Sequence, residues 1–138
     1  MRKRTQAREF ALQLLYQLDI TEDKDCEVVL SNLWQTQDEA VADDIKGFTA
    51  DLVKGVAAHL EEIDERISQY ASNWQIERMA VVDRNIMRLA SYELLFRGDI
   101  PPKVSINEAI ELAKKYSGIE AAKFVNGILD KVKIDKKV

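Results

Sequence analysis

Hydrophobic residues recur along most of this chain at the spacing of an amphipathic helix. Between residues 5 and 18 they follow the i, i+3, i+4, i+7 rule, which predicts a first helix. The same spacing predicts a short helix around 28–34 and then continues from 48 to 70. That last stretch is long for one globular helix, and two adjacent glutamates in it suit a new first turn. We therefore expect a break near 58–62.

The second half of the chain predicts three more helices. The segment 79–97 is strongly amphipathic, and a glycine and two prolines soon after it end that helix, because proline cannot donate its amide. An S-x-x-E capping box begins at Ser105 and predicts a helix from there to about Tyr116, with Gly118 as its C-terminal cap. Apolar residues between 124 and 132 indicate a final helix.

These patterns predict an all-α fold. Few runs alternate with a period of two, and glycine (five) and proline (two) are scarce, so strands have almost no support. The chain of 138 residues suits one domain over 1–138, with roughly six or seven helices. We expect the Lys-rich tail 135–138 to be disordered.

Composition argues against a membrane or secreted protein. No stretch approaches the roughly 20 uncharged apolar residues of a spanning helix. The basic start precedes a short apolar run without a cleavage site, so we expect no signal peptide. The single cysteine, Cys26, excludes an internal disulfide. A cytoplasmic protein is the expectation.

The net charge of −4 is distributed unevenly. Residues 1–18 carry four basic side chains against one acid, residues 19–65 carry three against fourteen, and residues 66–138 carry thirteen against nine. Because contacts with phosphate are local and screened within about 10 Å, this acidic chain can still bind a polyanion at either end.

The sequence holds little that suits catalysis. His59 and Cys26 have no partners of the kind that a zinc or Cys–His site needs, so we interpret both as structural. Paired carboxylates lie in the acidic run, where solvation is the simpler explanation. Phosphate-binding glycine loops are absent from the sequence. We expect no enzyme, no cofactor and no metal site.

Two groups of basic residues are candidates for nucleic-acid binding. Arg4 and Arg8 stand one helical turn apart, on a face that we expect to point away from the core, and such a face suits a phosphate backbone. Lys114, Lys115 and Lys123 bracket the turn before the final helix. We expect these groups to converge after folding. The alternative is that a basic terminus merely aids solubility.

Aromatic residues raise further alternatives. Phe124 could stack on a base if it is exposed, although periodicity places it in the core. Leu12 and Tyr16 form a second apolar ridge on the first helix, and Tyr92 accompanies a polar row on the helix of 79–97. These features fit either the second face of a two-layer bundle or a protein-docking surface.

Four segments together carry a resemblance to the NusB family of bacterial transcription antitermination factors. They are AREFALQLLYQLD (7–19), RMAVVDRNIMRLASYELLF (78–96), PPKVSINEAIELAKKYS (101–117) and KFVNGILDK (123–131). The resemblance implies two packed helical bundles without catalysis or cofactor. It also implies binding of boxA RNA in ribosomal RNA leader transcripts together with NusE, a small-subunit ribosomal protein, in a complex with NusA, NusG and RNA polymerase.

The resemblance also implies roles for particular residues. The implied RNA-binding residues are Arg2, Lys3, Arg4, Arg8, Glu120, Lys123 and Phe124. The implied NusE-facing residues are Tyr16, Asp83, Arg84 and Tyr92. Many relatives have arginines where this chain has Thr5 and Gln6, so its phosphate contacts should be weaker or differently placed. The alternatives are a helical module that dimerises through Tyr16 and Tyr92, or an accessory domain like that of ribosomal RNA cytosine methyltransferases.

Overall fold

The computed structural model of the chain describes residues 2–21, 24–71 and 75–136. Within them lie seven α-helices and one short 3-10 helix, η1, and no strand, so the all-α prediction is confirmed. The elements are α1 (Arg2–Ile20), α2 (Cys26–Gln35), α3 (Asp43–Ala58), α4 (Leu60–Tyr70), η1 (Ile76–Arg78), α5 (Val81–Phe96), α6 (Pro102–Tyr116) and α7 (Ile119–Lys136).

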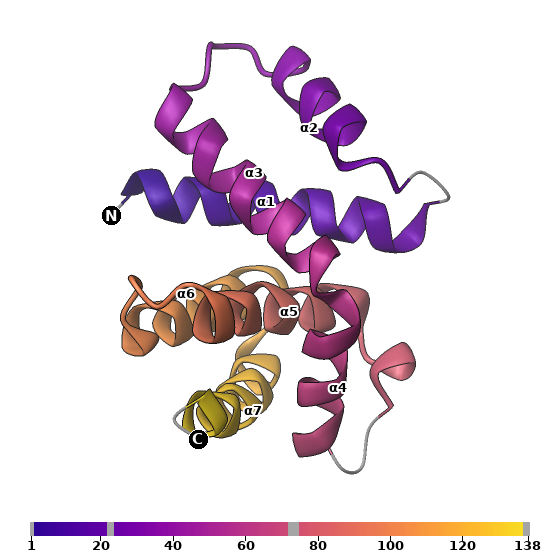
Figure 1. Cartoon of the computed structure of the whole chain (residues 1–138), viewed down its shortest axis with the longest axis vertical. Helices are drawn as coiled ribbons and strands as arrows, with labels where there is room; N and C mark the ends of the chain where they lie inside the picture. Colours follow the sequence, from indigo (N-terminus) through magenta and orange to yellow (C-terminus); the bar gives the residue numbers. More distant parts are fainter. Residues whose placement is uncertain (1, 22–23, 72–74, 137–138) are drawn as a thin grey trace.

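The helices form two bundles, as the family resemblance implies. Figure 1 shows α1, α2 and α3 in the upper half and α4 to α7 in the lower half. Helix α5 joins the bundles, because it packs against α1 and α3 on one side and against α4, α6 and α7 on the other. Its side chains are accordingly buried almost all round: Ile86, Met87, Leu89 and Leu94 are all at most 2% exposed. No helix among the described residues is long and apolar enough to span a bilayer.

The expected break in the long third stretch is confirmed at His59. Helix α3 ends at Ala58 and α4 begins at Leu60. The His59 ring stacks on Phe96 with the ring centroids 4.0 Å apart. This histidine therefore sits in an aromatic stack at a helix junction, which agrees with a structural role.

The predicted capping box at Ser105 is wrong. Helix α6 begins one turn earlier, at Pro102, where a proline in the first turn loses no helical hydrogen bond. Ser105 is buried, and its hydroxyl donates to Glu93 Oε1 at 2.7 Å. The predicted C-terminal cap is confirmed: Gly118 has a φ of 133°, a conformation that favours glycine, and its amide donates to the Ala113 carbonyl at 2.8 Å.

The Lys-rich tail 135–138, which we expect to be disordered, begins within helix α7, because that helix continues through residue 136. Residues 137 and 138 lie outside the described part of the chain.

Candidate nucleic-acid and partner interface

Arg8, predicted to face away from the core, is instead buried between the two bundles. Its side chain is 3% exposed, and its Nε and Nη2 donate to the two carboxylate oxygens of Glu93, each at 2.8 Å. Its Nη1 lies 3.3 Å from Glu108 Oε1. Burial alone lowers the pKa of Arg8. The hydrogen bonds and negative charges of Glu93 and Glu108 outweigh burial, so the pKa of Arg8 is raised. The guanidinium is therefore engaged inside the protein, and phosphate cannot reach it without opening the interface.

Arg4 and Lys3 remain on the surface at the beginning of α1. The Arg4 guanidinium lies 4.3 Å from the centroid of the Phe48 ring on α3, within the range of a cation–π contact. Lys3 Nζ is 3.2 Å from Asp44 Oδ2, and both side chains are more than half exposed. The side chain of Arg2 lies outside the described part of the structure.

A third arginine, which the sequence analysis did not single out, lies at the same phenylalanine. The Arg97 guanidinium is 5.4 Å from the Phe48 centroid, and it forms ion pairs with Asp51 and Asp99. Hydrogen bonding to Arg97 holds the pKa of the Asp99 carboxyl at about 2. Arg97 follows the last residue of α5, so this cationic site marks the C-terminal end of that helix.

Phe124 lines an open groove at the other end of α5. The groove has a volume of about 380 Å³ and lies between η1, the first turn of α5 and the first turns of α7. Its polar lining residues are Arg78, Asp83 and Glu120. Phe124 is partly buried and packs against the core, while its ring also forms part of the groove wall. Core packing and access to a ligand thus coexist at this residue.

The predicted lysine patch is compensated by carboxylates. Lys123 is 70% exposed and lies 3.4 Å from Glu120. Lys115 Nζ is 2.6 Å from Glu9 Oε2, which joins the end of α6 to α1. Lys114 lies 3.6 Å from Glu111 on its own helix. Local charge beside Phe124 is therefore mixed rather than strongly positive.

The Arg4 site and the Phe124 groove lie at opposite ends of α5, whereas Lys115 reaches α1 through Glu9. Arg4 shares the Phe48 ring with Arg97 at one end of α5, whereas Phe124 shares its groove with Asp83 at the other. The 16 residues of α5 span about 24 Å. A stacked strand carries one phosphate about every 3.4 Å, so this span corresponds to about seven nucleotides.

Tyr16 lines a second groove, adjacent to the first. This groove has a volume of about 590 Å³ and is formed by α1 together with residues of α5 and α6. Tyr16 and Tyr116 line it and are 40% and 48% exposed. Val82 belongs to this groove and the next residue, Asp83, to the Phe124 groove. Both grooves therefore reach the first turn of α5.

Tyr92 does not lie on a surface with Tyr16. It is 6% exposed, and its hydroxyl donates to Asp51 Oδ1 at 3.1 Å. Burial, with the charge of Asp51, raises its pKa. The ring packs so closely on Gly55 of α3 that an added Cβ would lie 2.2 Å from it. The prediction of a shared Tyr16 and Tyr92 docking surface is wrong, because the upper bundle covers Tyr92.

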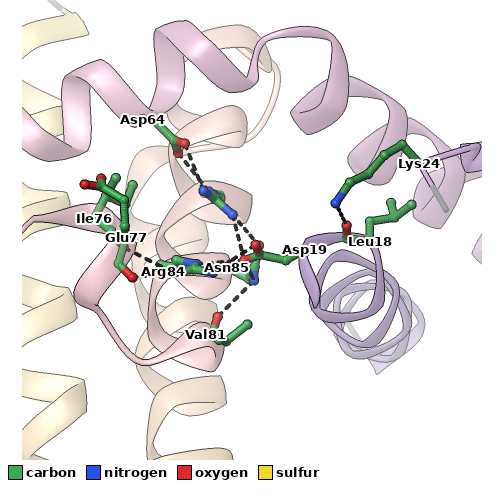
Figure 2. Close-up of polar contacts among 10 residues, drawn as sticks. Leu18, Asp19, Lys24, Asp64, Ile76, Glu77, Val81, Arg84 and Asn85 are labelled. Carbon is green, nitrogen blue, oxygen red and sulfur yellow. Dashed lines mark hydrogen bonds and ion pairs between the residues drawn. The ribbon is translucent and has the colours of Figure 1, made fainter. Parts of the chain in front are cut away.

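Arg84 is engaged within the protein, as Figure 2 shows. Its Nε and Nη2 donate to the carboxylate of Asp19 at 2.7 and 2.9 Å, and its Nη1 reaches the backbone carbonyls of Ile76 and Glu77. Asn85 donates to the same Asp19 at 2.8 Å. These contacts tie the end of α1 to α5 and η1. Sequence reasoning missed this network because its partners are distant along the chain.

The geometry defines a class of protein before any comparison. In the described part of the chain, no three His, Cys, Asp or Glu side chains are grouped as metal ligands. The outer surface instead carries two adjoining grooves with aromatic walls and separate exposed cations. This is the surface of a helical binding module.

Comparison with known proteins identifies the family. The sequence model of the NusB family matches residues 5–133, and the chain belongs to that family. It is 51% identical over 133 residues to the transcription antitermination protein NusB of an Anaeromyxobacter species, covering 94% of this chain and 89% of the relative. It is 44% identical over 137 residues to the NusB protein of Thermodesulfovibrio yellowstonii, covering 94% of this chain and 91% of the relative.

Solved structures agree with this assignment. A structure of NusB from T. maritima matches with a TM-score of 0.85 and 39% identity, covering 96% of this chain and 91% of that one. A crystal structure of antitermination factors NusB and NusE in complex with dsRNA matches with a TM-score of 0.88 and 30% identity, covering 98% of both chains.

Proposed function

We propose that this chain is a transcription antitermination factor that binds boxA RNA of ribosomal RNA leader transcripts together with NusE. The observation that carries the proposal is the Phe124 groove, an aromatic wall open to solvent beside polar and charged side chains. Support also comes from family relatives that are named transcription antitermination proteins, and from the related NusB that was crystallised with NusE and dsRNA.

The RNA contacts divide into two kinds. Phe124 stacks on an unpaired base, because sequence-specific RNA recognition generally uses bases that are splayed out onto aromatic rings. Lys123 and Glu120, at the exposed rim of α7, contact the same nucleotide or its neighbour. Arg4 and Lys3 bind phosphates farther along the strand, which positions the RNA without reading its sequence.

NusE occupies the neighbouring groove. Exposed Tyr16 lines this groove together with Val82, and the next residue, Asp83, lines the Phe124 groove. A protein docked there lies next to an RNA on Phe124, so each partner reduces the cost of ordering the other. The resulting complex joins NusA, NusG and RNA polymerase.

Replacement of Phe124 by alanine and by leucine tests this proposal. Phe124→Ala should weaken binding of a boxA RNA by about 1–3 kcal/mol, the usual value of one stacked base. Phe124→Leu keeps apolar volume against the core and should fold normally while losing most of the stacking. Trp34→Leu is the matched control, since Trp34 is a similarly half-buried aromatic that packs on Phe10 in the other bundle. Titrations with and without NusE, alongside thermal unfolding, provide the measurement.

Two results would contradict the proposal. In the first, Phe124→Leu binds RNA with the affinity of the unaltered protein, and Phe124→Ala fails to fold in thermal unfolding. Phe124 would then be a core residue only. The other is a homodimer in sedimentation that NusE does not displace.

A further inference from the structure

Arg78 is a cation at the Phe124 groove that neither the charge pattern nor the family resemblance singled out. It is the last residue of η1, the short helix before α5, and its side chain is exposed. It lines the groove opposite the first turns of α7, together with Asp83 and Glu120. The chain thus brings an arginine from one element to face an aromatic ring from another.

The Arg78 guanidinium is available for a ligand. Two arginines that join elements of the fold are held by carboxylates: Arg8 by Glu93 and Arg84 by Asp19. The Arg78 side chain, in contrast, forms no hydrogen bond or ion pair with any residue in the described ranges, although two carboxylates line the same groove. The nearer partner of Glu120 is Lys123, at 3.4 Å.

The lining of the groove matches the chemistry of one nucleotide. Its apolar wall is formed by Met79, Ala80, Ala121 and Phe124, and its volume of about 380 Å³ is sufficient for a base. A planar base on this wall would leave its phosphate at the exposed rim, where a guanidinium can donate two parallel hydrogen bonds to phosphate oxygens.

We propose that Arg78 binds the phosphate of the nucleotide whose base stacks on Phe124, and so completes a single base-and-phosphate subsite. This inference rests on the proposed RNA-binding function. It adds a phosphate contact about one α5 length away from the Arg4 site, at the end of the molecule where the charge is otherwise balanced between Lys123 and Glu120.

Salt-dependent RNA titrations of Arg78→Ala and Arg78→Lys test the inference. Each phosphate neutralised adds about 0.9 to the slope of log K against log salt for duplex and about 0.7 for single strands. Arg78→Ala should lower that slope by roughly one such increment and weaken binding several-fold, and Arg78→Lys should recover most of the slope. Phe124→Leu should weaken binding with the slope unchanged. Lys54→Ala, which removes an equal charge at an exposed Glu27 pair in the upper bundle, is the control.

The outcomes separate the inference from the function on which it rests. If the unaltered chain does not bind boxA RNA, the proposed function fails. If the chain binds and Phe124→Leu is impaired, but the Arg78→Ala slope equals that of Lys54→Ala, the Arg78 subsite alone is overturned. Loss of NusE binding by Arg78→Ala with RNA affinity intact also overturns it, and assigns the residue to the protein partner. Unchanged thermal unfolding of Arg78→Ala verifies that the comparison is made on folded protein.

Discussion

Arg4 and Arg8 are separated by one turn of the same helix, and both guanidiniums lie over the Phe48 ring, yet one region is exposed and the other is buried. Arg4 lies on the outer surface, whereas Arg8 lies in the interface between the bundles with Glu93 and Glu108. The difference does not come from α1 itself. It comes from α5 and α6, which place two carboxylates against one arginine and leave the other at the edge. Identical residue types one turn apart thus serve stability in one case and are open to a ligand in the other.

The largest expected effect is on stability, from Arg8→Ala. The Glu93 side chain is 1% exposed, so the substitution leaves a buried carboxylate without its main counter-charge. We expect a loss of about 3–5 kcal/mol in the free energy of unfolding, measured by urea denaturation. Adding Glu93→Gln should recover part of that loss, because a neutral amide is cheaper to bury. Arg4→Ala is the control and should change stability little. A loss below about 1 kcal/mol for Arg8→Ala would remove the distinction between the two regions.

A smaller effect is expected at the second buried network, and it depends on pH. Burial raises the pKa of Asp19, but hydrogen bonds from Arg84 and Asn85 and the charge of Arg88 outweigh it, so the pKa falls below the usual value of an aspartate. The folded state therefore favours the ionised carboxylate. Its contribution to stability is complete above the unfolded-state pKa and is lost as pH falls through the lowered folded-state value.

Asp19→Asn measures this contribution. At neutral pH it should cost about 1–3 kcal/mol, because Arg84 loses a charged acceptor. The difference from the unaltered protein should shrink as the pH falls below about 4, as judged by urea midpoints across the acid range. A difference independent of pH would indicate that hydrogen-bond geometry, rather than ionisation, governs the network.

The smallest effect is expected on the surface, from Arg4→Ala. Binding of a long boxA RNA should weaken modestly and similarly for all sequences, and the salt slope should fall by about one unit. Arg4 and Phe124 mark opposite ends of α5, about seven nucleotides apart. An RNA much shorter than that, bound in the Phe124 groove, cannot also reach Arg4. Such an RNA should bind Arg4→Ala and the unaltered protein with the same affinity. Equal sensitivity of short and long RNAs to Arg4→Ala would mean that the two sites are closer than the fold places them.

Local pattern predicted the elements well because helix periodicity and breaks are local properties. The break at His59 and the glycine cap at Gly118 both follow from neighbours within a turn. The failure at Ser105 has a clear cause: its hydroxyl has a stronger tertiary partner in Glu93 than a helix amide would provide. Arg78 was missed for a related reason, since only folding brings η1 opposite α7.

The amino-acid sequence was sufficient to predict an all-helical protein, the positions of most of its helices, and the family that it resembles. Those properties depend on the spacing of residues along one helix and on motifs that are continuous in the chain. The tertiary structure alone decided which charges are buried and which grooves are open. Arg8 and Tyr92 were hidden, and Arg78 and Phe124 were brought together, because burial depends on what a second helix places opposite a side chain. The periodicity of a single helix does not contain the identity of the residues that another helix places against it.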